Sequence, residues 1–143
     1  MSPDPLFDVG REIAVVTGVA GQLGGQYARA LLARGARVAG LDLKPSAGSE
    51  ALAAEFGDRF AFHAASVTDH ASLAAALATI TAQFGTPTVL VNNAALDSPP
   101  SAPLEENGPY ETYPEASFDR VMDVNVKGVH LCCQVFGGAM ARA

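Results

Sequence analysis

The sequence predicts an α/β fold whose core is a doubly wound parallel sheet. Short runs rich in β-branched residues alternate with longer stretches of helical periodicity, which is typical of βαβ units. The first of these runs, residues 13–16, is apolar throughout, as a strand covered by helices on both faces should be. The chain has 143 residues, of which 49% are hydrophobic and 17% charged, so we expect residues 1–143 to form one domain with a sizeable core.

The order of the elements follows from this periodicity and from the residues at the element ends. We expect strands over residues 13–16, 37–41, 60–65 and 88–91, and helices over residues 22–34 and 50–56 and between the cap Asp69 and the stop residue Gly85. A polar turn over residues 42–49 precedes the second helix. A loop rich in proline, glycine and glutamate, residues 96–114, precedes a last helix over residues 117–140. Such long loops are often functional.

Composition and charge argue against several classes of function. The net charge is −6 with acidic residues spread along the chain, so we expect no nucleic-acid partner and no anionic membrane surface. No apolar run approaches the ~18 residues that span a bilayer, and residues 1–10 lack the basic and apolar regions of a secretory signal.

The two cysteines indicate the compartment. Cys132 and Cys133 are neighbours in the chain, and their α-carbons are closer than ordinary disulfide geometry allows. No histidine stands at ligand spacing beside them, so we expect no metal site. The interpretation is a cytoplasmic protein with two buried thiols on a helix.

A glycine-rich turn joins the first strand to the first helix and carries the main chemical signal. Gly18, Gly21 and Gly24 let the backbone approach a pyrophosphate, and the helix start offers unpaired N–H groups and a partial positive charge. Asp42 directly follows the second strand, where the dinucleotide fingerprint places an acid for a ribose hydroxyl. Close packing alone would also explain the glycines, but not Asp42 in register. The pattern therefore predicts a Rossmann-like sheet of strand order 3-2-1-4 that binds a dinucleotide.

The carboxylate of Asp42 also favours NAD over NADP as the cofactor. A 2′-phosphate ~4 Å from a carboxylate is repelled by about 1–4 kcal/mol per charge pair, depending on the local dielectric. The glycine turn holds no Arg or Lys to offset this, although Lys44 lies within reach. The alternative interpretation of Asp42 is a solvated turn residue.

Three segments together resemble those of the short-chain dehydrogenase/reductase family, closest to its compact branch. They are the turn over residues 17–24, Val-Asn-Asn-Ala-Ala over residues 91–95, and Val-Asn-Val-Lys-Gly over residues 124–128. With Asp42 they follow the family's order and rough spacing and span nearly the whole chain. Two positions depart from the compact branch: Gln22 stands where Gly or Ala is usual, and Ala95 where Gly is usual.

The resemblance implies a set of cofactor-binding residues. Gly18, Gly21, Gln22, Leu23 and Gly24 would line the pyrophosphate and ribose, Asp42 and Leu43 the adenosine, Ser66 and Val67 the adenine edge, and Asn93 and Ala94 the cofactor ribose through their backbone atoms. The family often has Asp where Ser66 stands, which implies a different contact with the adenine amine. Asn92 would tie its strand end to the neighbouring strand.

Asn125 is the one polar member of an apolar helical stripe. The other members are Phe118, Val121, Met122, Val129, Cys132, Cys133 and Phe136. A buried amide left without a partner costs about 1–3 kcal/mol, so Asn125 must form hydrogen bonds. The resemblance implies a catalytic role, in which Asn125 helps to hold a water that links the catalytic lysine to solvent. A plain structural hydrogen bond in the core is the alternative.

The resemblance implies an NAD-dependent oxidoreductase that moves a hydride between nicotinamide and a secondary alcohol or ketone. The family's chemistry also needs a Ser, and a Tyr with a Lys four residues later. None of Tyr27, Tyr110 and Tyr113 is followed by such a lysine. We therefore expect the 143 residues to be the N-terminal half of a longer enzyme, truncated before a fifth strand.

Two other functions compete with this interpretation. One is a non-catalytic nucleotide-binding or interaction module with the same fold. The other is a methyltransferase on a related sheet, which does not explain the two asparagines at residues 92 and 93 together with Asn125. The last helix resembles the family helix that packs between subunits, so we expect a homodimer or homotetramer.

Overall fold

A parallel sheet of four strands forms the centre of the protein. The structure is a computed structural model, which describes residues 8–98 and 101–143. The strands are β1 (Ile13–Thr17), β2 (Arg37–Asp42), β3 (Phe60–Ala64) and β4 (Val89–Val91). They lie side by side in the order β3-β2-β1-β4, and each neighbouring pair is parallel. The predicted fold class and strand order are therefore confirmed.

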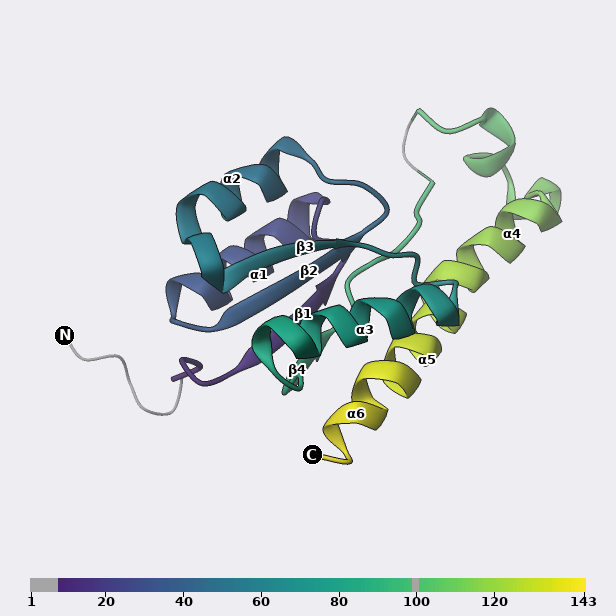
Figure 1. Cartoon of the computed structure of the whole chain (residues 1–143). Coiled ribbons are helices and arrows are strands. Elements are labelled where there is room, and N and C mark those ends of the chain that lie inside the picture. The colour runs from purple at the N-terminus through teal and green to yellow at the C-terminus, as the bar shows by residue number, and fades with distance from the viewer. Residues whose placement is uncertain (1–7, 99–100) are drawn as a thin grey trace.

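Helices cover both faces of the sheet (Figure 1). On one face lie α1 (Gln22–Ala33) and α2 (Ala47–Phe56), and on the other lie α3 (His70–Phe84) and the long helix over residues 115–140. All five residues of β1 are buried, and the first four alternate between two cores. Ala14 and Val16 pack with Leu32 of α1, while Val15 packs with Ile80 of α3. Burial on both faces explains why residues 13–16 of this strand are all apolar.

Capping residues set where two of the helices begin. Asp69 caps α3 as predicted, with its carboxylate accepting from the Ala71 N–H at 2.9 Å. The prediction for α2 was wrong by three residues, because it begins at Ala47 and not at residue 50. Ser46 and Ser49 form a reciprocal capping box in which each hydroxyl accepts from the other's backbone N–H. A serine here takes the place of the usual Glu or Gln, and this hid the signal.

The long helix is continuous from Glu115 to Met140. It comprises α4 (Glu115–Met122), α5 (Val129–Cys132) and α6 (Gly138–Met140), joined by π-helical turns at Asp123–Gly128 and Cys133–Gly137. Its C-terminal half packs against α3, whereas α4 extends beyond the sheet (Figure 1).

The apolar stripe expected on this helix is only partly buried. Cys132 and Phe136 are buried, but Phe118 and Met122 are exposed. Cys133 is exposed too, so the expectation of two buried thiols was wrong. Two causes explain the difference: α4 has no core to pack against, and each π-turn shifts the buried face away from the regular helical period.

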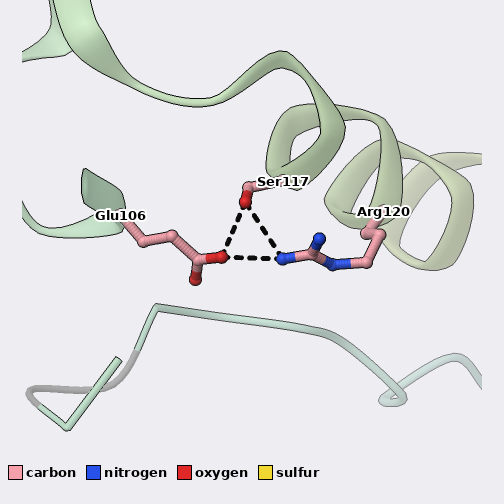
Figure 2. A network of polar contacts seen from close by, with 3 residues as sticks. All are labelled: Glu106, Ser117 and Arg120. Atoms are coloured by element: carbon pink, nitrogen blue, oxygen red, sulfur yellow. Dashed lines mark hydrogen bonds and ion pairs between the residues drawn. The ribbon is translucent and has the colours of Figure 1, made fainter. Parts of the chain in front are cut away.

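In its described part, the loop over residues 96–114 carries 3₁₀ turns at Leu104–Glu106 and Tyr110–Thr112, and it is fastened to the start of α4. Figure 2 shows the contact: the Glu106 carboxylate accepts from the Ser117 hydroxyl at 2.6 Å and from the Arg120 guanidinium at 2.7 Å. The guanidinium also donates to the Ser117 hydroxyl at 3.0 Å. We call these three residues the clasp. No helix in the described part of the chain is long and apolar enough to cross a membrane.

Candidate functional site

A pocket of about 550 Å³ opens where the strands end and their loops leave the sheet. It lies at the carboxyl edge, which is where open α/β sheets bind their ligands. All the predicted cofactor residues except Gly24 line it: Gly18, Gly21, Gln22, Leu23, Asp42, Leu43, Ser66, Val67, Asn93 and Ala94. Segments far apart in the sequence therefore meet around one cavity.

The glycine turn forms the floor of this pocket. Gly18 has a φ of +68°, a left-handed conformation that favours glycine, and a Cβ there would lie 2.9 Å from the Ala94 Cα. Gly24 is buried under the turn, where a Cβ would lie 2.2 Å from the Gly18 carbonyl oxygen. Gly24 therefore shapes the turn by close packing and does not line the cavity.

Thr17, at the last position of β1, joins this turn to the segment after β4. Its hydroxyl oxygen accepts from the backbone N–H groups of Asn93 and Ala94, both at 3.0 Å. The Asn93 amide donates to the Thr17 carbonyl at 3.0 Å and to the Gly18 carbonyl at 3.3 Å. The sequence interpretation overlooked Thr17, although a hydroxyl at the end of a buried strand is a usable signal.

The side chains of the two neighbouring asparagines bond to different elements. Asn93 ties the end of β4 to its neighbour β1. Asn92, which was expected to do this, instead directs its amide to the Cys133 sulfur of the long helix at 3.4 Å. The expectation for Asn92 was therefore wrong.

Asp42 lies in the pocket wall with its carboxylate held at two points. One oxygen accepts from the Ala20 N–H of the glycine turn at 3.0 Å, and the other from its neighbour Leu43 at 2.8 Å. A carboxylate has about four acceptor positions, so two of them remain for a ligand hydroxyl. These two bonds fix the direction of the carboxylate within the turn.

The wall beyond β3 is formed by Ser66, Val67 and Thr68. The two hydroxyls of Ser66 and Thr68 lie 2.9 Å apart and form a hydrogen bond with each other. The Ser66 oxygen also accepts from the Thr68 N–H at 3.3 Å. The Ser66 side chain thus stabilises its own loop, and Val67 presents an apolar surface beside it.

Asn125 does not line the pocket but holds a residue that does. Its amide donates to the Leu96 carbonyl at 2.9 Å, and its oxygen accepts from the Leu96 N–H at 2.7 Å. Asn125 is only partly buried and both hydrogen bonds are exposed, so they are not the hydrogen bond in the core that was considered as the alternative. Leu96 and Val124, which the sequence interpretation overlooked, are brought to the cavity by this packing.

The model of the short chain dehydrogenase family matches residues 12–143. The chain belongs to this family. A D-threitol dehydrogenase of Mycolicibacterium smegmatis is 36% identical, over 100% of this chain and 53% of that protein. The human 3-hydroxyacyl-CoA dehydrogenase type-2 is 34% identical, over 91% of this chain and 49% of that protein. The chain spans about half the length of these curated relatives.

Solved structures of the family share the architecture. A 3-ketoacyl-(acyl-carrier-protein) reductase from Brucella melitensis complexed with NADH matches with a TM-score of 0.74 and 32% identity, over 86% of this chain and 48% of that one. A metagenomic short-chain oxidoreductase in complex with NADP matches with a TM-score of 0.78 and 29% identity, over 94% of this chain and 59% of that one. Known members of this family of oxidoreductases thus bind either dinucleotide.

Titratable groups are sparse around the pocket of this family member. Among the described residues that line it, Asp42 alone is titratable.

Burial raises the pKa of Cys132 to about 11, with a smaller contribution from Cys133. Burial lowers the pKa of His63 on β3, whose Nε2 is buried without a partner in the described structure. Neither of these two groups lines the pocket, and the described residues hold no cluster suited to a metal ion. The described residues that line the pocket are suited to binding a ligand and holding it in position.

Proposed function

We propose that this chain forms the dinucleotide site of an NAD-dependent oxidoreductase that transfers a hydride between nicotinamide and a secondary alcohol or ketone. The single observation that carries the proposal is the Asp42 carboxylate, fixed to the glycine turn through Ala20 and facing the pocket. In this arrangement the adenosine ribose directs its hydroxyls to Asp42, and the diphosphate lies over the turn. The nicotinamide ring supplies the carbon that gives or takes the hydride.

The start of α1 fits a diphosphate because no side chain caps it. Its first position follows Gly21, which has no side chain to offer, whereas α2 and α3 are capped by Ser46 and Asp69. The first N–H groups of an α-helix have no partner within the helix and carry a partial positive charge. An anion at this point would satisfy them, and the exposed backbone of Gly21 leaves room for it.

The other walls would orient the two ends of the cofactor. Leu43, Val67 and Val124 offer apolar surface to a flat adenine ring. The segment from Asn93 to Leu96 would lie along the path toward nicotinamide, held by Thr17 and Asn125. Asn125 has one N–H and one lone-pair position left after bonding to Leu96, and these would serve the water that the resemblance implies.

The preference for NAD can be tested by changing Asp42. We expect wild type to bind NADH more tightly than NADPH, because the 2′-phosphate meets the carboxylate. Asp42→Ala should narrow the gap between the two cofactors by about fivefold, which corresponds to about 1 kcal/mol for a charge pair in a solvated setting.

Calorimetric titration of both cofactors provides the measurement. Asp58→Ala is the matched control, since it removes the same charge from an exposed position outside the pocket. An unchanged gap in Asp42→Ala would contradict the assignment of Asp42, and a wild type that binds neither cofactor would contradict the proposal as a whole.

A second candidate is a nucleotide-binding module without catalysis. It is favoured by the absence of any titratable group other than Asp42 among the described residues that line the pocket. Oxidation of an alcohol needs a general base near the hydroxyl, and Asp42 is committed to the adenosine side in this proposal. An assay of the whole protein with NAD and secondary alcohols, followed by the absorbance of NADH, separates the two candidate functions. Turnover supports the oxidoreductase, and cofactor binding without turnover supports the nucleotide-binding module.

We also propose that the protein assembles as a homodimer or homotetramer through the long helix. Phe118, Met122 and Val126 are spaced four residues apart and are 53%, 39% and 53% exposed. Exposed apolar side chains gathered on one helix face are typical of an interface between subunits. A second copy of the same helix offers a matching apolar face, as a two-fold axis requires.

A further inference from the structure

The long helix touches the loop after β3 at one glycine. Gly128 is buried, and a Cβ built on it would lie 2.8 Å from the Val67 Cγ2 and 3.2 Å from the Val67 Cβ. The Val67 carbonyl oxygen would lie 3.6 Å away. Real Cβ atoms essentially never lie closer than 3.0 Å to a neighbouring heavy atom, so the helix and the loop approach this closely because position 128 has no side chain.

The residue that Gly128 contacts is part of the pocket. Val67 lines the cavity on the β3 side, and Val124, four residues before Gly128 on the long helix, lines it as well. The same helix therefore contributes one wall residue directly and supports another from behind. Any atom added at Gly128 must move Val67, or move the helix and Val124 with it.

Val67 has little freedom to give way. A β-branched side chain is stiff about its first torsion, so the methyl groups cannot swing aside without strain. The backbone on either side is fixed by the hydrogen bond between the Ser66 and Thr68 hydroxyls at 2.9 Å. The Ser66 N–H is also held by the Ser72 hydroxyl of α3 at 3.2 Å. A displacement at Val67 therefore changes the wall of the cavity that it lines.

We propose that Gly128 is a positioning residue that sets the place of Val67 and so the width of the cavity on its adenine side. This inference rests on the proposed function, since it takes the occupant of that side to be the adenine ring of a dinucleotide. Gly128 acts through Val67 and does not itself line the cavity. The place of the adenine ring would thus depend on Gly128, a residue that contacts Val67 but does not line the cavity.

The test compares two glycines of the same helix by calorimetric titration. For Gly128→Ala we expect the Kd for NADH to rise about tenfold, which corresponds to about 1.4 kcal/mol. ADP-ribose, which keeps the adenine half and lacks nicotinamide, should lose affinity by the same factor. Gly137→Ala is the matched control, because a Cβ there meets no atom within 4 Å. It makes the same gain in helix propensity and should leave both Kd values unchanged.

A second change separates positioning from a loss of stability. Val67→Ala removes the methyl group that the new Cβ would meet, so Val67→Ala/Gly128→Ala should bind both ligands more tightly than Gly128→Ala alone. The double variant also serves if Gly128→Ala does not fold. The role of Gly128 is overturned if Gly128→Ala binds like Gly137→Ala, if only NADH and not ADP-ribose is affected, or if the double variant gives no recovery. Wild type that binds neither ligand would overturn the proposed function together with this one.

Discussion

Thr17 shows how one hydroxyl can organise a binding site from beneath. It is 1% exposed, and its oxygen accepts two backbone N–H groups of the segment after β4. Because these donors belong to Asn93 and Ala94, the backbone segment that lines the pocket after β4 is fixed to the end of β1. The site therefore depends on a residue that no ligand would touch.

Replacing this hydroxyl should cost both stability and binding. Thr17→Val keeps the shape but leaves the two N–H groups without an acceptor, so we expect the free energy of unfolding to fall by about 1–3 kcal/mol. Affinity for NADH should fall as well, since Ala94 lines the pocket. Urea denaturation and NADH titration provide the measurements.

Two further variants give this prediction its controls. Thr17→Ser should restore most of the loss because it returns the oxygen. Thr79→Val removes a hydroxyl from an exposed position of α3, where it bonds only to the backbone carbonyl of Ala75, and should be nearly neutral. Equal stability of Thr17→Val and wild type would contradict the role given to the hydroxyl.

The sequence predicts some residues of the site from local spacing and others from the family resemblance. Gly18, Gly21 and Asp42 belong to one βαβ unit, so the distances along the chain already fix their relation in space. Leu96 and Val124 were overlooked because only the packing of the long helix brings them to the cavity. The choice between Asn92 and Asn93 depends on how the chain leaves β4, which alternation along a strand does not determine.

At the scale of elements, the sequence predicts which elements exist better than where they end. All four strands are confirmed, with ends that differ by one residue at most. The start of α2 was misplaced because two serines form its cap. The buried face of the long helix was misplaced because its two π-turns interrupt the regular period. Helical periodicity and capping residues are local signals. The two wrong predictions arise where the local sequence departs from the usual capping pair or from the regular helical period.

The clasp gives the 96–114 loop a defined attachment that can be broken. Glu106→Ala removes the acceptor shared by Ser117 and Arg120, and the Glu106 side chain is 15% exposed whereas that of Arg120 is 59% exposed. A hydrogen bond to a charged group contributes about 1.5–3 kcal/mol to stability. Because solvent screens the exposed Arg120, we expect Glu106→Ala to lower the free energy of unfolding by about 1 kcal/mol.

Hydrogen exchange measures the release of this loop. We expect faster exchange at Asn107 and Glu106, whose backbone N–H groups close the 3₁₀ turn at residues 104–106. Glu111→Ala, at an exposed position of the same loop, is the matched control and should leave these rates unchanged. Identical exchange in Glu106→Ala and wild type would show that the clasp does not hold the loop.

For the whole molecule, the long helix connects parts that the sheet does not. It meets the end of β4 through Cys133 and Asn92, the pocket wall through Asn125 and Leu96, and the 96–114 loop through the clasp. Figure 1 shows this helix running beside α3 and past the edge of the sheet. A subunit packed on its outer face would therefore touch the element that supports the cavity.

The proposed assembly predicts a change in mass when that outer face is altered. We expect wild type to elute as a dimer or tetramer in size-exclusion chromatography with light scattering. Val126→Glu should shift it to monomer, since burying an unpaired carboxylate in an apolar contact is unfavourable. Leu104→Glu, at an 87% exposed position in the loop, is the control and should not change the mass. A monomeric wild type at micromolar concentration would contradict the assembly.

The paired hydrogen bonds between Asn125 and Leu96 continue the pattern of backbone hydrogen bonding past the end of β4. The Asn125 amide presents one donor and one acceptor to the backbone N–H and carbonyl of a single residue, Leu96, as a neighbouring strand would. Leu96 has left the sheet, yet its backbone is restrained as though it were still in it. A small shift of the long helix would therefore also displace the Leu96 backbone, which lies in the wall of the cavity.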